Sequence, residues 1–190
     1  MDDEKETLHR YLRAQRTSLL SKLDGLDEYG IRRPMTRTGT NLLGLVKHVA
    51  GVEVGYFGEV FDRPSGIELP WLADGAPDNA DMWATADESR ADIVELHHRC
   101  AAHSDATIDA LPLDAVGNVP WWGDRGRVTL HQILVHMAVE TARHAGHADI
   151  VRELIDGAVG SRPNDPNIPE VDWPGYVAQV EAAAKEVGGS

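Results

Sequence analysis

The amino-acid sequence predicts an all-α protein, a four-helix bundle with a short fifth helix at its C-terminal end, in one domain over residues 1–190. Four long segments place apolar residues three and four positions apart, the spacing of a helix with one buried face. Proline- and glycine-rich stretches separate these segments. We find no internal repeat and no alternation long enough for a strand. Long helices joined by loops are typical of a bundle.

The first helix is expected over residues 3–27, and Gly30 and Pro34 end this section of the chain. We interpret His9 as facing solvent. The apolar residues that recur at helical spacing here are Leu8, Tyr11, Leu12, Leu19, Leu23 and Leu26.

The second helix is expected over residues 41–61, after a loop at 31–39. Thr40 is the predicted N-cap, because its hydroxyl can accept a hydrogen bond from an early backbone N–H. Glycine is costly inside a helix. The glycines here therefore indicate a close approach by another helix, or space left beside His48. They are Gly44, Gly51, Gly55 and Gly58.

The third helix is expected over residues 86–110, after a loop-rich segment at 62–84. Thr85 and Glu88 have the spacing of a capping box, which predicts that the helix opens there. We interpret Cys100 as a small core residue, and a single cysteine excludes an internal disulfide. Three histidines on this helix are interpreted as polar residues flanking the core: His97, His98 and His103.

The fourth helix is expected over residues 129–157, after a loop at 112–128. Thr129 is its predicted cap and Gly157 its predicted end. A short last helix is expected over residues 174–187.

Composition narrows the function classes. Hydrophobic residues make up 42% and charged residues 26% of the 190, which is normal for a soluble globular protein. The formal net charge of -13 disfavours nucleic acid and anionic membrane surfaces as partners. No apolar run approaches membrane-spanning length, and the acidic start does not resemble a signal peptide, so we expect a cytoplasmic protein.

The fourth helix carries a stripe whose ends are apolar and whose middle is polar. Its members are Leu130, Ile133, Met137, Glu140, His144, His147, Val151 and Leu154. A buried carboxylate is costly unless it is paired or bound to a metal. Glu140 and His144 are four residues apart, so one divalent ion can bridge them. His48, on a mostly apolar face of the second helix, is the candidate third ligand.

Two interpretations of these groups compete. They could be ordinary core polar residues satisfied by hydrogen bonds, which is the better interpretation of His48 alone. Because Glu140 needs a compensating charge, the combination with His144 favours a metal. We expect His147 to pack against a neighbouring side chain or to hold it by a hydrogen bond, and His136 could instead orient Glu140. The alternative is that both histidines are only packed or partly exposed.

The loop before the fourth helix contains candidate ligand-binding residues. Trp122, next to Trp121, offers apolar area, and Arg125 or Arg127 could hold an anionic group. We expect this loop and the loop at 31–39 to rim a pocket, in which Trp122 and Arg127 bind cofactor or substrate. The alternatives are tryptophans that cap the core and arginines that are merely exposed.

Two motifs carry a resemblance to a known family. LLGLVKHVAGVE and, about 90 residues later, HMAVETARHAGHADIVRELIDG resemble the DinB/YfiT-like superfamily of bacterial four-helix metalloproteins, above all its actinobacterial branch. The likeness spans residues 5–157. The superfamily's metal ligands match His48, Glu140 and His144. Many members have histidine at the position of Glu140, and the carboxylate resembles mycothiol-dependent maleylpyruvate isomerases.

The resemblance implies a metal-dependent enzyme that uses a low-molecular-weight thiol, mycothiol. Such an enzyme is an S-transferase, which joins the thiol to a small electrophile, or an isomerase of that electrophile. Zn²⁺ is the first expectation for the metal, with Ni²⁺, Mn²⁺ or Fe²⁺ as alternatives. A metal-dependent hydrolase and a non-catalytic metal- or small-molecule-binding protein of the stress response remain open. Bundles of this kind often pair, so a homodimer is a further expectation.

Overall fold

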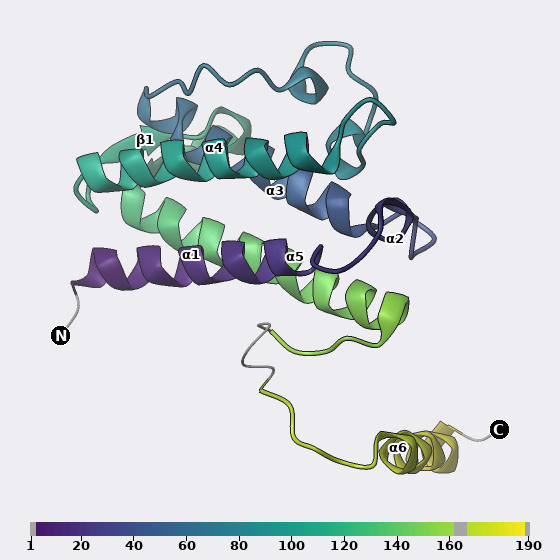
Figure 1. The fold of residues 1–190 in the computed structure, drawn as a ribbon. Coiled ribbons are helices and arrows are strands. Elements are labelled where there is room, and N and C mark those ends of the chain that lie inside the picture. The colour runs from purple at the N-terminus through teal and green to yellow at the C-terminus, as the bar shows by residue number, and fades with distance from the viewer. Residues whose placement is uncertain (1–2, 162–166, 189–190) are drawn as a thin grey trace.

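The computed structural model describes residues 3–161 and 167–188, and its main body is a four-helix bundle (Figure 1). α1 packs against α5, and α3 packs against both α4 and α5. The all-α prediction is confirmed. The bundle helices are α1 (Glu4–Ser21), α3 (Leu42–Phe57), α4 (Arg90–Ala110) and α5 (Leu130–Asp156).

Short elements fill the connections, and one longer helix stands apart. α6 (Trp173–Gly188) lies away from the bundle in Figure 1, and its described residues are all exposed. The short helices are α2 (Glu28–Arg32), η1 (Glu59–Phe61), η2 (Pro70–Leu72), η3 (Ala80–Met82) and η4 (Pro120–Arg125).

Two helices are shorter than predicted. α1 ends at Ser21, and the chain then turns through Gly25, whose φ of 76° is outside the helical region. α3 ends at Phe57, and the 3-10 turn η1 completes the expected 41–61 segment. Helix ends are set by local turns that an apolar period does not reveal.

The predicted helix caps are wrong for the start of α3 and confirmed for both ends of α5. Asn41, and not Thr40, caps α3: its side chain accepts from the backbone N–H of Gly44 at 2.8 Å. At α5, Thr129 accepts from the backbone N–H of Gln132, and Gly157 ends the helix in the left-handed region, as predicted.

The predicted capping box of the third helix is displaced by four residues. Ser89 and Asp92 form the box, and α4 begins at Arg90. Thr85 N–H does donate to the Glu88 carboxylate at 2.7 Å, so the predicted pair exists as a turn before the helix. Both pairs fit the same sequence signature, and the nearer one to the periodic segment opens the helix.

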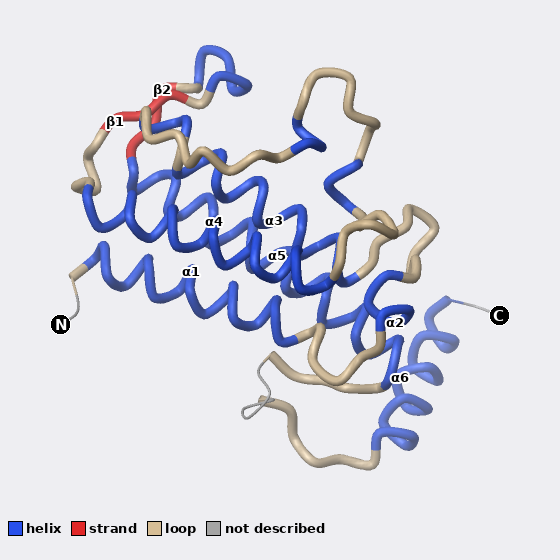
Figure 2. Tube along the Cα trace, turned by 45° about the horizontal axis from the view of Figure 1, so that its top comes forward, coloured by secondary structure: helices blue, strands red, loops and turns tan. Residues whose placement is uncertain are grey.

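A small hairpin was not predicted. β1 (Val116–Asn118) pairs antiparallel with β2 (Arg127–Thr129), with Gly117 opposite Val128, at one end of the bundle (Figure 2). Strands of three residues are too short to show a detectable alternation.

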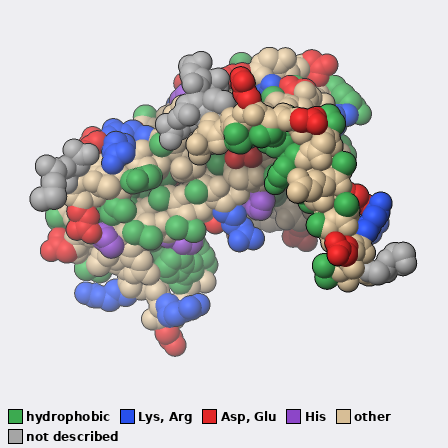
Figure 3. Space-filling model, turned by 90° about the horizontal axis from the view of Figure 1, so that it is seen from below, with side chains coloured by type: hydrophobic (Ala, Val, Ile, Leu, Met, Phe, Trp, Pro, Cys, Tyr) green, Lys and Arg blue, Asp and Glu red, His purple; other side chains and the backbone are tan. Residues whose placement is uncertain are grey.

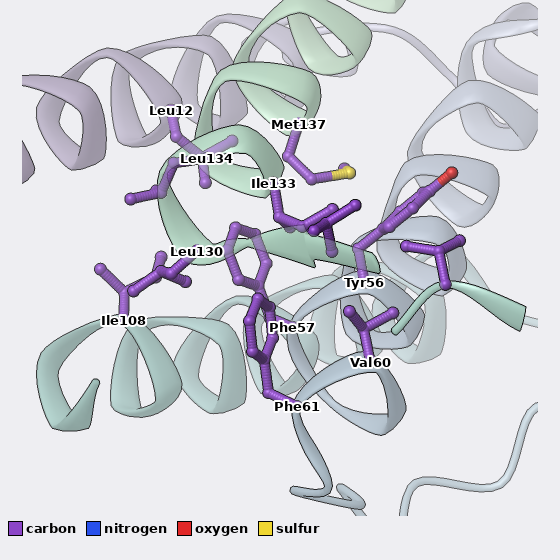
Figure 4. Packing of buried hydrophobic residues seen from close by; sticks show 12 residues of the cluster. Leu12, Tyr56, Phe57, Val60, Phe61, Ile108, Leu130, Ile133, Leu134 and Met137 are labelled. Carbon is purple, nitrogen blue, oxygen red and sulfur yellow. The ribbon is translucent and has the colours of Figure 1, made fainter. Parts of the chain in front are cut away.

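The core lies inside the bundle, and the part nearest the hairpin is shown in Figure 4. Phe57 of α3 and Ile133 and Met137 of α5 are fully buried in it. This packing fixes α3 against α5 along the lengths that carry the candidate ligands. Tyr56 lies beside His136, and His48 lies beside His144, so the two helices run antiparallel.

A buried ion network ties α1 to α3 and α4. Arg16 donates two hydrogen bonds to Glu53, at 2.7 and 2.9 Å, and one to Asp105 at 2.6 Å. His9 also bonds to Asp105, at 2.7 Å, and is 3% exposed. The prediction that His9 faces solvent is therefore wrong, because the inner face of α1 carries polar residues that are paired inside the bundle.

The surface agrees with the acidic composition. On the face shown in Figure 3, Lys and Arg side chains stand in small separate groups among acidic and hydrophobic ones. No helix in the described part of the chain is both long and apolar enough to span a bilayer.

Candidate metal centre and adjoining cavity

The structure brings the three predicted ligands together. His48 comes from α3, and Glu140 and His144 come from adjacent turns of α5. One potential ligand atom from each lies within 4.8 Å of the others. Glu140 Oε1 is 3.0 Å from His144 Nε2 and 3.8 Å from His48 Nε2. Two imidazoles and a carboxylate form a donor set that fits a divalent transition metal.

The cluster borders the buried face of α5 and does not lie within it. The side chain of Glu140 is 28% exposed and that of His144 is 12% exposed. His147 and Leu154, which the predicted stripe includes, are exposed. A stripe of alternating three- and four-residue steps drifts around a straight helix, so some of its later members leave the core although Val151 stays buried. The residues that are buried on α5 are Leu130, Ile133, Leu134, Met137, Thr141, Ala145, Ala148 and Val151.

Asp81 holds the ring of His48 from behind. His48 Nδ1 donates to Asp81 Oδ2 at 2.6 Å, which leaves Nε2 directed at the cluster. A carboxylate on the far nitrogen of a ligating histidine fixes its tautomer and orientation. Sequence reasoning missed Asp81 because it lies in the aperiodic segment 62–84.

The segment that carries Asp81 is anchored by a buried lysine. Lys47 is 2% exposed, and its ammonium donates to the carbonyls of Ala80 and Trp83, each at 3.0 Å. It also forms an ion pair with Glu88 at 2.8 Å. The residue next to His48 in the sequence therefore fixes the backbone on both sides of Asp81.

Gly44 allows the same segment to approach α3. A Cβ added to Gly44 would lie 1.8 Å from the carbonyl oxygen of Met82, a distance that no side chain tolerates. From the sequence, the glycines of this helix were expected to meet a neighbouring helix or to leave space beside His48. At Gly44 the neighbour is the backbone of the loop beside Asp81, so the glycine serves the candidate site.

Burial sets the protonation of the histidines beside Glu140. Burial lowers the pKa of His144, and the nearby His48 lowers it further. Burial also lowers the pKa of His136, one turn before Glu140. The neutral imidazole is the form that binds a metal. His144 Nδ1 is buried without a hydrogen-bond partner among the residues that the structure describes.

A cavity of about 760 Å³ opens beside the cluster. His48, Asp81 and Glu140 are among its lining residues, so a ligand in the cavity would reach a bound ion. α3 supplies one wall, and the segment 64–72 supplies another. The volume suits a drug-sized molecule.

The predicted rim is only partly present in this cavity. Trp121 lines it, and its indole N–H donates to the Tyr56 hydroxyl at 3.3 Å. Trp122 is not a lining residue; its ring packs on His136, with centroids 5.0 Å apart. Arg127 is exposed on β2 and does not line the cavity. Cofactor binding by Trp122 and Arg127 stays a prediction.

His136 and His147 were predicted to support the candidate ligands. His136 lines the cavity, and no hydrogen bond from it to Glu140 is found in the described structure. His147 is exposed, and its ring lies against that of His144, with centroids 5.4 Å apart.

The chain was compared with known protein families. Residues 7–157 match the family described as mycothiol-S-transferase. A search of curated proteins finds no match. The matched range contains the three candidate ligands and Asp81, ends one residue after α5 and leaves α6 outside.

Proposed function

The chain belongs to the mycothiol-S-transferase family, and from this premise we propose that it joins the sulfur of mycothiol to a small electrophile in the cavity beside His48, Glu140 and His144. The observation that carries the proposal is the convergence of these three side chains, of which His48 and Glu140 line a cavity large enough for a substrate.

A divalent ion held by His48, Glu140 and His144 would supply positive charge that favours the thiolate form of a thiol near neutral pH. Zn²⁺ is the first candidate, with Ni²⁺, Mn²⁺ and Fe²⁺ as alternatives. Asp81 keeps the ring of His48 in position through its Nδ1 hydrogen bond.

The transfer itself forms one S–C bond. The thiol proton passes to a base in the cavity, and the electrophile either loses a leaving group with its electron pair or, in an addition, takes up a proton. His136 is a candidate for the base because it lines the cavity and burial lowers its pKa, which keeps the ring neutral.

The test is thiol-dependent turnover. Purified protein, loaded with Zn²⁺, is incubated with a panel of electrophiles, with and without mycothiol, and compared with His48→Ala. We expect turnover that needs the thiol and is lost in His48→Ala. The matched control is His98→Ala, since His98 is an exposed histidine of α4 outside the cavity.

Other outcomes would favour the remaining candidates. Turnover without thiol would identify a hydrolase, and ligand binding without turnover would identify a non-catalytic binding protein. Trp122→Ala and Arg127→Ala, with folding and metal content checked, test whether these residues contact the thiol. The homodimer expected from the bundle is tested by sedimentation.

A further inference from the structure

The walls of the cavity next to the cluster are mostly apolar. α3 contributes Val52 and Tyr56, and the segment above it contributes Ile67, Leu69 and Trp71. Apolar walls hold the body of a ligand through the area they remove from water.

The floor of the cavity is open at Gly55. A Cβ added there would meet no atom within 4 Å, although Gly55 lines the cavity. A glycine in a helix is costly, and here no packing against neighbouring atoms requires it. The position therefore leaves room for the ligand.

The charged groups of the lining are all acidic. Glu59, Glu68, Asp81 and Glu140 face the cavity, and no Lys or Arg is among the lining residues of the described chain. Asp81 is paired with His48, and Glu140 lies within the candidate metal cluster. Glu59 and Glu68 form no ion pair with a described residue.

The formal charges do not cancel when a divalent ion is bound. The two positive charges of the ion are offset by the negative charges of Glu140 and Asp81. The negative charges of Glu59 and Glu68 are then left without a counter-charge, and a thiolate would add a further negative charge. An anionic group of the electrophile that lies away from the ion would lose hydration without gaining a Lys or Arg partner, and Glu59 and Glu68 would repel it. Arg125 and Arg127, the arginines proposed from the sequence to hold an anionic group, are both outside the lining.

We propose that this cavity selects uncharged or cationic electrophiles with an apolar body and rejects anionic ones. The proposal rests on the proposed function, since it names the substrate class of the same site. The apolar body lies over Gly55, and Glu59 and Glu68 set the preference for charge.

The first experiment compares three electrophiles that share one reactive group and one alkyl body. Their far ends carry an amide, a carboxylate or a trimethylammonium group, and each rate is divided by that of the uncatalysed reaction with mycothiol. We expect kcat/KM for the carboxylate electrophile to be at least about tenfold below kcat/KM for the amide electrophile. We expect kcat/KM for the cationic electrophile to equal or exceed the value for the amide. Equal or better turnover of the carboxylate would overturn the proposal.

The second experiment assigns the preference to its residues. The double variant Glu59→Gln/Glu68→Gln should narrow the amide-to-carboxylate ratio at least about threefold. Added salt should narrow it in the unmodified protein, because both carboxylates are exposed to solvent. The control is Glu95→Gln, an exposed carboxylate of α4 outside the cavity. A ratio that the double variant leaves unchanged would contradict the assignment.

The third experiment fills the open floor. Gly55→Leu should lower kcat/KM for the amide electrophile at least about tenfold without loss of bound metal. Gly146→Leu is the matched control, since Gly146 is an open glycine inside α5, exposed and outside the cavity. Unchanged turnover in Gly55→Leu would show that the substrate body lies elsewhere.

Failure of this proposal is distinguishable from failure of the proposed function. Thiol-dependent turnover without charge discrimination would overturn only the substrate class. If thiol-dependent turnover is absent, equilibrium binding is measured with unreactive versions of the same three probes, in which the reactive group is replaced by its saturated analogue. Equal affinity of the carboxylate and amide probes would then overturn the charge selection as well.

Discussion

α3 carries two polar residues, Glu53 and His48, whose surroundings differ: one is buried in an ion pair and the other lies beside a cavity. Glu53 is 1% exposed, and Arg16 holds both of its carboxylate oxygens. His48 faces Glu140, whose side chain is 28% exposed, beside a cavity. The first group is satisfied within the chain. The second brings together two imidazoles and a carboxylate with no Lys or Arg within ion-pair distance of Glu140 among the described residues.

The difference separates a structural site from a candidate functional one. A buried carboxylate that already has a guanidinium partner has no need of a ligand. A half-buried carboxylate that shares its space with two histidines gains most from an added cation.

Arg16→Met should destabilise the fold by about 3–5 kcal/mol, because it leaves the Glu53 carboxylate buried without its partner. Urea denaturation measures the loss. Arg13→Met is the control: Arg13 pairs with Glu6 at the surface, where both side chains are about half exposed, and its loss should cost less than about 1 kcal/mol. A cost for Arg16→Met no larger than that of the control would show that the network is dispensable.

Addition of Zn²⁺ to metal-free protein should stabilise it by about 2.7 kcal/mol at one hundred times the Kd. For a chain of this size, the corresponding rise in Tm is roughly 5–10 °C. The rise should vanish in Glu140→Gln and His144→Ala. It should persist in His98→Ala, which alters an exposed histidine away from the cluster. If neither Zn²⁺, Ni²⁺ nor Mn²⁺ raises the Tm, and elemental analysis finds no metal, the site is not a metal site.

Asp81→Asn should weaken metal binding by about 10- to 100-fold, since the His48 ring loses the carboxylate that orients it. A chelator-competition titration of the metal-free protein gives the affinity. Asp78→Asn is the matched control, because Asp78 is exposed in the same loop and does not line the cavity. Equal affinities in the two variants would mean that Asp81 does not support the site.

Asp105→Asn tests the buried ion network through the pH dependence of the free energy of unfolding. Burial opposes ionisation of Asp105, but hydrogen bonds from His9 and Arg16 outweigh it and lower the pKa. A carboxyl group whose pKa is lower in the folded state stabilises the fold above its unfolded pKa of about 3.9, and this contribution is lost as pH falls through the folded pKa. The variant should therefore be less stable than the unmodified protein at pH 7, with a gap that closes below about pH 4. Denaturation at both pH values measures the gap, and a gap that persists at low pH would contradict the prediction.

His147→Ala should have the smallest effect, a change in metal affinity of less than about threefold. His147 is exposed and touches only the edge of the His144 ring. The comparison is with His144→Ala in the same titration. Loss of metal as complete as in His144→Ala would make His147 a ligand and would enlarge the site.

Much of the fold follows from local pattern. The positions of α1, α3, α4 and α5 were predictable because the apolar spacing and the glycines and prolines between helices act within a few residues. The ends were less predictable, as Asn41 and Ser89 show, because neighbouring residues of the same type compete for one cap.

The four-residue spacing of Glu140 and His144 was enough to place them on one side of a helix, since residues four apart in an α-helix are neighbours in any fold. The sequence also indicated His48 as the third member, through the apolar residues around it and the family resemblance. Only the tertiary structure showed that these three side chains meet, at 3.0 and 3.8 Å from the same Glu140 oxygen.

Tertiary packing alone decided the surroundings of the site. Asp81 reaches His48 because Lys47 anchors an aperiodic loop, and Gly44 lets that loop approach α3. Arg16 lies inside because its partners, from α3 and α4, arrive only when the bundle closes. Periodicity reports which face of a helix is apolar. It does not report which distant polar groups will satisfy one another, because those contacts depend on the packing of segments far apart in the chain.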